Sequence, residues 1–314
     1  MIPAYIYASS AVSTQDSFLG ADFVNNLERI EAVKEIKIPV YREFIKPMLM
    51  RRMGKATKMS IACAFNCMRQ LEMEQPEAII VGTGLGALTD TEKFLSVSTA
   101  TEEKMLPPTA FIASGHNTIA GQIALLLKND LYNMTHVQRE LSFEYAVLDA
   151  MLSVTEGKDN ILTGAFDELT PKVMDLAERF ELDSSIKNQL SEGAAFFVLG
   201  NNKAKAITEI RSVEILEFSD LSECILAFLE KNNVSENTTL KGFVGFNLQP
   251  KSEINLPFET LCYTDFCGRF FTSSSFGTHL ASSHLMANAN SGDSALVINL
   301  VSEKQVALTL LQRV

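Results

Sequence analysis

Residues 77–86 read Glu-Ala-Ile-Ile-Val-Gly-Thr-Gly-Leu-Gly, a short apolar run that leads into a turn rich in glycine. An apolar run of this length predicts a strand buried on both faces, as in a parallel or mixed sheet. The glycines predict a tight turn in which the backbone approaches a neighbouring segment closely. Because the turn lacks the third glycine of a dinucleotide-binding fingerprint at the required offset, it does not predict a nucleotide site.

Helical and extended patterns alternate on both sides of this stretch. Apolar residues at helical spacing predict a helix over Lys55–Met73, ended by Pro76. We expect Phe111–Ser114 to form a strand and Asn117–Lys128 a helix buried on every side. Further strands are expected over Ala4–Ala11, Ile36–Val40, Asn160–Ala165, Glu192–Gly200, Gly242–Leu248, Ala295–Val301 and Val306–Leu311. Further helices are expected over Val173–Phe180 and Leu221–Lys231. A loop is expected over Asn232–Thr239. The alternation predicts a layered α/β fold.

Composition limits the kinds of partner. The 314 residues are 46% hydrophobic, which is enough to bury a large core in one elaborate α/β unit or two fused halves. A net charge of -11 argues against nucleic acid or an anionic membrane as the main partner. The first residues have no signal-peptide pattern, and no apolar run approaches the roughly 20 residues of a membrane span, so we expect a cytoplasmic protein.

The cysteines predict neither a disulfide framework nor a metal centre. There are five, an odd number, and their spacings do not form a metal-binding clip with nearby histidines. They are Cys63, Cys67, Cys224, Cys262 and Cys267. We therefore expect free or buried thiols, no metal and no cofactor.

Five segments of the chain, in this order, resemble the β-ketoacyl synthase family. They are Arg52–Met59, Ile80–Gly86, the turn at Ser114, Gly164–Glu168 and Glu192–Leu199. The resemblance implies a thiolase-like fold, which is a five-layer α-β-α-β-α sandwich of two similar halves whose subunits normally dimerise. We expect a single domain over residues 1–314, with halves at about 1–180 and 181–314.

In that family a cysteine on the turn between a strand and a buried helix takes an acyl chain from a carrier protein, and two histidines assist decarboxylation. The matching turn reads Ser114-Gly-His-Asn-Thr, which puts His116 at the nucleophile position. An imidazole forms no stable thioester, so the resemblance implies that covalent acyl transfer is lost. Cys63 has a context that imitates the nucleophile peptide, but it lies inside a predicted helix and is expected to be a core residue.

The two family histidines also have altered matches. The first follows a strand of the second half, where this chain has Phe246 and Asn247. The nearest match to the second is His279, one residue late and without the family's lysine. One residue on a helix turns a side chain by about 100°, so we expect His279 to face another direction. We expect His136 and His284 to be surface or packed residues. The candidate pocket residues are His116, Asn117, Thr118, Phe246, Asn247, Thr278 and His279.

A ketosynthase fold without the cysteine and histidines resembles a chain-length factor. The resemblance implies a non-catalytic partner of an active ketosynthase in a fatty-acid, polyketide or aryl-polyene pathway, working with an acyl carrier protein. One alternative is an active synthase or acyltransferase with an atypical site, and another is a homodimer that binds carrier protein or acyl groups. A carrier protein could dock on the basic residues Lys46, Arg51, Arg52, Lys55 and Lys58, which otherwise form a solvated helix face.

Overall fold

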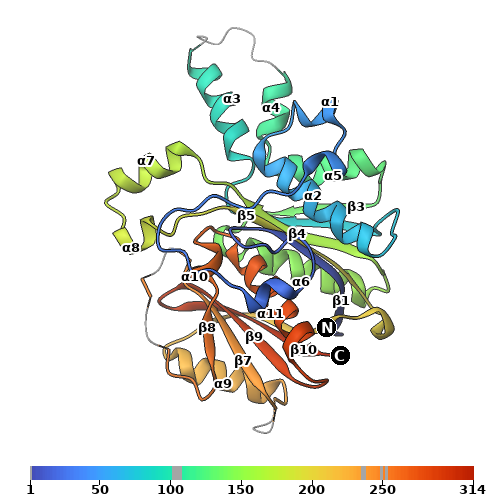
Figure 1. The fold of residues 1–314 in the computed structure, drawn as a ribbon, viewed down its shortest axis with the longest axis vertical. Helices are drawn as coiled ribbons and strands as arrows, with labels where there is room; N and C mark the ends of the chain where they lie inside the picture. Colours follow the sequence, from blue (N-terminus) through green and yellow to red (C-terminus); the bar gives the residue numbers. More distant parts are fainter. Residues whose placement is uncertain (1, 101–107, 235–237, 248–249, 252–253) are drawn as a thin grey trace.

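The computed structural model describes residues 2–100, 108–234, 238–247, 250–251 and 254–314. These residues form a ten-stranded sheet in the order β3-β2-β4-β5-β1-β6-β10-β9-β7-β8, with helices on its faces (Figure 1). The order β8-β7-β9-β10-β6 of the second half repeats the order β3-β2-β4-β5-β1 of the first. The two halves meet where β1 pairs with β6 over only three residue pairs.

The ten strands follow the chain in two groups of five. They are β1 (Ala4–Val12), β2 (Ala78–Gly82), β3 (Tyr132–His136), β4 (Ile161–Asp167), β5 (Gly193–Gly200), β6 (Thr208–Glu217), β7 (Leu240–Gly245), β8 (Thr260–Cys262), β9 (Ser294–Ser302) and β10 (Gln305–Arg313). Strand β2, the quoted apolar run, is buried throughout and lies parallel to β3 and β4, as its composition predicts.

The helices connect the strands. They are α1 (Pro47–Met50), α2 (Lys55–Gln70), α3 (Leu88–Ala100), α4 (Pro108–Ser114), α5 (Thr118–Leu127), α6 (Ser142–Thr155), α7 (Pro171–Arg179), α8 (Ser184–Lys187), α9 (Leu221–Lys231), α10 (Thr264–Cys267) and α11 (Ser273–Asn288). Helix α9 shows how the sequence sets such an element. Asp220 caps its first turn by accepting a hydrogen bond from the amide of Glu223, and Ile225, Phe228 and Leu229 bury one face.

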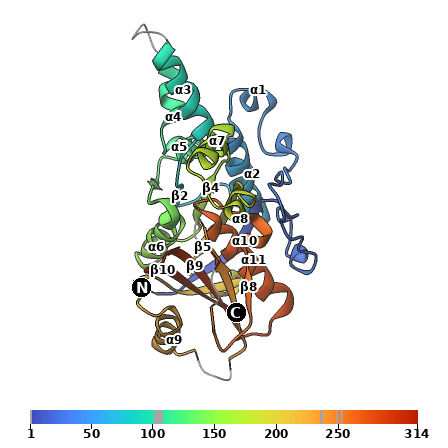
Figure 2. The same cartoon turned by 90° about the vertical axis from the view of Figure 1, so that its left-hand side faces the viewer.

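The helices form three layers separated by the two halves of the sheet (Figures 1 and 2). Helices α2 and α5 cover the outer face of the first half, α9 covers that of the second half, and α6 and α11 lie between the halves. Each layer has its own apolar cluster. The five-layer arrangement of two repeated halves expected from the sequence is confirmed.

The boundary between the halves lies later than expected. Strand β5, which ends at Gly200, belongs to the first half because it pairs with β1 and β4. The second half begins with β6 at Thr208. The boundary therefore falls between residues 200 and 208, and not near residue 180.

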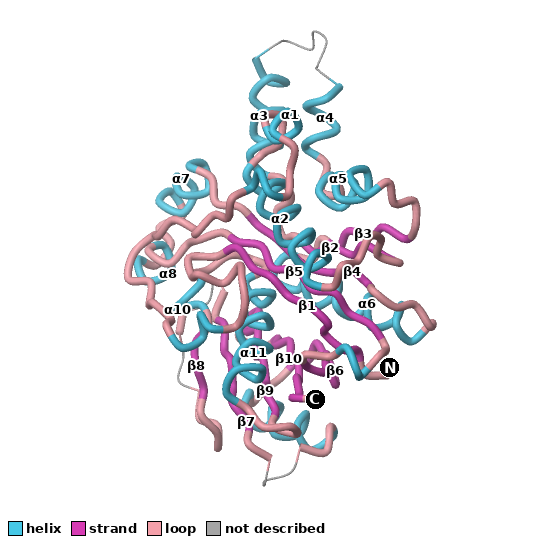
Figure 3. The backbone as a smooth tube through the Cα atoms, turned by 45° about the vertical axis from the view of Figure 1, so that its right-hand side comes forward, coloured by secondary structure: helices cyan, strands magenta, loops and turns pink. Residues whose placement is uncertain are grey.

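The prediction for residues 111–128 was partly wrong. Phe111–Ser114 belongs to helix α4, which begins at Pro108, a residue suited to the first turn of a helix. Helices α3 and α4 project from the body of the molecule (Figures 1 and 3). Helix α5 is not buried on every side, since only Ile119, Ala120 and Ile123 are buried. Within the described residues no single helix has the length and hydropathy of a membrane span. Helices α4 and α5 have that length and hydropathy only when taken together, and the pair is bent by 104°.

Other extended segments also differ from expectation. Ile36–Val40 forms no strand, while β3 and β6 were not anticipated. Strand β7 begins earlier than predicted, at Leu240, and ends at Gly245; Leu248 lies outside the described residues. Of the expected loop, the described residues 232–234 and 238–239 lie outside helices and strands.

Candidate functional site

In the first half, the strand that leads into a buried central helix is β3, and the helix is α6. The turn between them consists of Val137, Gln138, Arg139, Glu140 and Leu141. Arg139 has a φ of 50°, which is uncommon for a residue with a side chain. No cysteine stands in this turn. The N-terminus of a buried helix stabilises a thiolate, so the turn before α6 is where a nucleophilic cysteine would benefit. This turn carries no thiol.

The glycine-rich turn after β2 packs against the start of this helix. A Cβ atom at Gly82 would lie 2.4 Å from the carbonyl oxygen of Ser142, and one at Gly84 would lie 2.4 Å from the Cβ atom of Phe271. Gly86 has a φ of 72°. The tight turn and close approach predicted from the sequence are confirmed, and they bring the turn against the starts of both central helices.

A buried polar cluster joins the starts of α6 and α11. Asn299 on β9 donates hydrogen bonds to Oε1 of Glu144 at 2.8 Å and to the carbonyl oxygen of Glu140 at 2.9 Å. Asn247, just after β7, donates to Oδ1 of Asn299 at 2.8 Å, and Ser273 Oγ donates to Oδ1 of Asn247 at 2.7 Å. A chain of hydrogen bonds thus runs from α11 to α6 through side chains that are all buried.

Glu144 is the ionisable member of this cluster. Burial raises the pKa of its carboxyl to about 7, although the hydrogen bond from Asn299 acts in the opposite direction. The carboxyl can therefore exchange a proton near neutral pH. Among the described residues no thiol or imidazole is hydrogen-bonded to Glu144, Asn247, Ser273 or Asn299.

Asp167, at the end of β4, ties the glycine-rich turn to the start of α11. Its carboxylate accepts hydrogen bonds from Thr83 Oγ1 at 3.1 Å and from the amides of Gly84 at 3.0 Å and Leu85 at 2.9 Å. It also accepts bonds from Thr272, from Oγ1 at 2.8 Å and from the amide at 3.1 Å. Burial raises the pKa of Asp167 to about 6 despite these donors.

An apolar cavity of about 400 Å³ lies beside Asp167. Its walls come from the glycine-rich turn, from α7 and the segment after it, and from the residues before α11; they include Leu85, Val173, Leu176, Phe180, Phe270 and Phe271. Arg269, which also lines the cavity, donates to the carbonyl oxygens of Phe246 at 2.6 Å and Asn247 at 2.9 Å. The size and lining of the cavity suit an apolar ligand.

The structure brings some of the candidate pocket residues together. Phe246, Asn247, Thr278 and His279 are all buried in the second half, and Asn247 belongs to the polar cluster. His279 does not join the polar cluster, because both ring nitrogens have other partners. Its Nδ1 contacts Ser9 Oγ and its Nε2 contacts the carbonyl oxygen of Ser17, both at 3.0 Å.

His279 also stacks on Phe23, with ring centroids 5.3 Å apart. Burial lowers its pKa to about 4, so the ring is neutral at physiological pH. Its imidazole is turned to the first strand and the segment that follows it.

His116, Asn117 and Thr118 are not part of this group. They lie between α4 and α5, where His116 and Asn117 are exposed and the His116 ring packs near Gly86. Thr118 lines a separate hollow next to α1. Because α4 replaces the expected strand, His116 does not stand on a strand-to-helix turn.

The remaining candidates are packing residues. Cys63 is buried in α2 with its thiol toward the carbonyl oxygen of Ala194, and burial raises the pKa of that thiol. His136 pairs with Asp149 at 2.9 Å, and His284 packs on Phe243. In the described part of the chain, no group of three or more His, Cys, Asp or Glu side chains could hold a metal ion.

Sequence reasoning missed Glu144, Asp167 and Asn299. Asp167 and the glycines of residues 82–86 lie in two of the segments that resemble the family, but the sequence did not indicate that they form one site. Glu144 and Asn299 stand in apolar surroundings, Ser142–Val147 and Ala295–Val301, and a polar residue in such a run is a signal of a buried interaction.

Comparison with known families supports the fold. A model of the beta-ketoacyl synthase N-terminal domain matches residues 27–231, which is well over half of the chain. The chain therefore belongs to the beta-ketoacyl synthase family. No curated protein sequence matches it at a significant level.

Solved structures of ketosynthase complexes share the fold. A type II polyketide acyl-carrier protein in complex with its ketosynthase bound to the hexaketide, AntDE:AntF, matches with a TM-score of 0.76 and 15% identity over 100% of this chain and 99% of that chain. The ishigamide ketosynthase/chain length factor matches with a TM-score of 0.75 and 16% identity over 99% of both chains. A ketosynthase (ApeO) in complex with its chain length factor (ApeC) from Xenorhabdus doucetiae matches with a TM-score of 0.58 and 12% identity over 100% of both.

Proposed function

We propose that this chain is a non-catalytic, chain-length-factor-like partner of an active ketosynthase in fatty-acid, polyketide or aryl-polyene biosynthesis. The observation that carries the proposal is the turn from β3 into α6, residues 137–141, which contains no thiol. The side chains of Glu144, Asn247, Ser273 and Asn299 beside it are hydrogen-bonded to one another in a chain.

The free edge of β3 is the surface we assign to the ketosynthase. Strand β3 is at the end of the sheet and pairs only with β2 among the described strands (Figure 3). Leu131, Tyr132 and Met134 are 52%, 38% and 39% exposed, and Leu152 on the adjoining α6 is 50% exposed. An exposed apolar edge strand readily pairs with another chain. Two of the structural neighbours are described as pairs of a ketosynthase and a chain length factor.

The apolar cavity beside Asp167 supports contact with an acyl group. Such a group would come from an acyl carrier protein, and one neighbour is a complex with a carrier protein. Lys46, Arg51 and Arg52 are exposed at α1 and could meet an acidic carrier, whereas Lys55 pairs with Glu192 at 2.7 Å. The cavity is also the feature that favours the second candidate, a homodimer that binds acyl groups without a ketosynthase.

Co-purification tests the partner. The chain is co-expressed with an active ketosynthase, and the mixed dimer is measured by size-exclusion chromatography with light scattering. Met134→Lys should weaken the mixed dimer at least about tenfold, because it puts a charge into the pairing edge. Leu95→Lys, at an exposed apolar position of α3, should leave the dimer intact. A self-paired wild-type chain that ignores the ketosynthase would favour the acyl-binding homodimer.

A further inference from the structure

Among the described residues of the second half, no helix corresponds to α5. In the first half, α2 follows the first strand and α5 lies between β2 and β3 in the chain; both cover the outer face. In the second half, α9 follows the first strand, β6, and takes the place of α2. The connection between β7 and β8 should supply the second helix, yet its described residues, 246–247, 250–251 and 254–259, form no helix.

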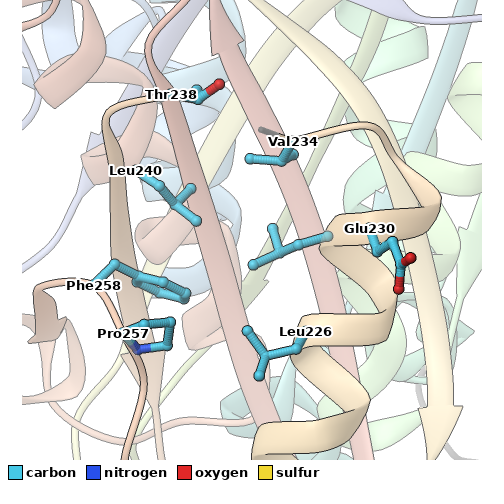
Figure 4. Close-up of a pocket in the computed structure, with 8 residues that line it drawn as sticks. Leu226, Glu230, Val234, Thr238, Leu240, Pro257 and Phe258 are labelled. Carbon is cyan, nitrogen blue, oxygen red and sulfur yellow. The ribbon is translucent and has the colours of Figure 1, made fainter. Parts of the chain in front are cut away.

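A groove of about 810 Å³ lies where that helix is missing (Figure 4). Leu226 and Leu229 of α9 form one wall, with Val234 just beyond the helix, and Leu240, Pro257 and Phe258 form the other. In Figure 4 the side chains of Leu226, Leu240 and Phe258 point into the space between the walls. Leu226 is 44% exposed, so this apolar surface faces solvent.

The groove matches the position of the last turns of α5. In the first half, the end of α5 lies at the start of β2, because Gln75, three residues before that strand, donates to the carbonyl oxygen of Leu127. In the second half, the groove lies at the start of the equivalent strand, where Leu240 is the first residue of β7. Ile254 and Leu256 pack against the apolar cluster of this half, so the connecting segment covers part of the face.

We propose that this groove binds a short amphipathic helix of a partner protein, which takes the place that α5 holds in the first half. The partner helix has an apolar stripe of about three turns and a basic residue at its edge. The basic residue would pair with Glu230, the one charged side chain among the described groove residues, which is exposed on α9. The net charge of -11 also favours a basic partner.

Two hydrocarbon-stapled helical peptides serve as probes for this groove. Each has about three turns and a leucine stripe, and they differ in one rim residue, lysine in the first and glutamate in the second. Binding of the fluorescent peptides to the full chain is measured by anisotropy. The lysine peptide should bind wild type more tightly than the glutamate peptide. Leu226→Glu should weaken it at least about tenfold, and Glu230→Lys should reverse the preference between the two peptides.

Control variants distinguish binding in the groove from nonspecific hydrophobic binding of the peptides. Leu95→Glu puts the same change at an exposed leucine of α3, 53% exposed, and should leave peptide binding unchanged. Unchanged thermal unfolding of each variant confirms that it is folded. Equal binding of both peptides to wild type and Leu226→Glu overturns the proposal. It is also overturned if sedimentation velocity shows wild type self-associating through this face and Leu226→Glu abolishing that, because the occupant is then a second copy.

Discussion

Asn299 on β9 donates a hydrogen bond of 2.8 Å to the carboxylate of Glu144 on α6, and so joins the two halves of the molecule at the starts of the central helices. Both side chains are buried, and Asn299 is held in turn by Asn247. A buried carboxyl that is hydrogen-bonded only to neutral groups lacks the opposite charge that would hold its pKa down. This relationship makes the stability of the junction depend on pH.

Glu144→Gln should flatten the dependence of stability on pH. The folded pKa of about 7 lies above the ordinary value of 4.5, so the folded state binds the proton more tightly than the unfolded chain. The stabilisation from this group is complete below pH 4.5 and is lost as the pH rises through 7. As the pH rises from 5 to 8, the free energy of unfolding of the variant should increase relative to that of wild type by on the order of 1–3 kcal/mol. Urea unfolding at both pH values measures this, with exposed Glu31→Gln as control; parallel curves for Glu144→Gln and wild type would contradict it.

His279→Gln should have the opposite signature. The folded pKa of about 4 lies below the ordinary 6.5, so the stabilisation is present above pH 6.5 and is lost as the pH falls through 4. The advantage of wild type over the variant should shrink by on the order of 1–3 kcal/mol between pH 7 and pH 4. The same urea unfolding series, extended to pH 4, measures the difference in unfolding free energy between wild type and His279→Gln. A constant difference would show that His279 is not held neutral by burial.

Asp167→Asn should destabilise the protein by roughly 2–4 kcal/mol, because an amide cannot accept all the hydrogen bonds that Thr83, Gly84, Leu85 and Thr272 now donate. Thermal unfolding at pH 7 checks this. Asp149→Asn, which alters a partly exposed pair with His136, is the matched control and should cost less. Equal losses for both variants would mean that Asp167 does not tie the glycine-rich turn to α11.

The sequence predicted several buried elements well, but it did not predict the central helices α6 and α11. Helix α9 was predicted with the bounds it has, and strand β5 differs by one residue from the prediction, because a continuous apolar face leaves little choice of structure. The fold class followed from the order of such segments. Glycines 82, 84 and 86 were understood as points of close approach, and the atoms they approach belong to Ser142, Phe271 and His116.

The site itself was less predictable. Strand β3 reads Tyr-Asn-Met-Thr-His, without a buried apolar run, because it lies at the edge of the sheet and is held by pairing with β2. Missing β3 moved the expected strand-to-helix turn to residues 111–117, and with it the role given to His116. The cluster of Glu144, Asn247 and Asn299 depends on contacts across the two halves, and single-sequence patterns do not encode such contacts.

Intact-protein mass spectrometry tests most directly whether this chain carries acyl groups. The chain, alone and mixed with its ketosynthase, is incubated with an acyl carrier protein thioester, and the mass of each subunit is measured under denaturing conditions. We expect the acyl increment on the ketosynthase and an unchanged mass for this chain in both samples. A stable acyl increment on this chain would contradict the account of a non-catalytic partner.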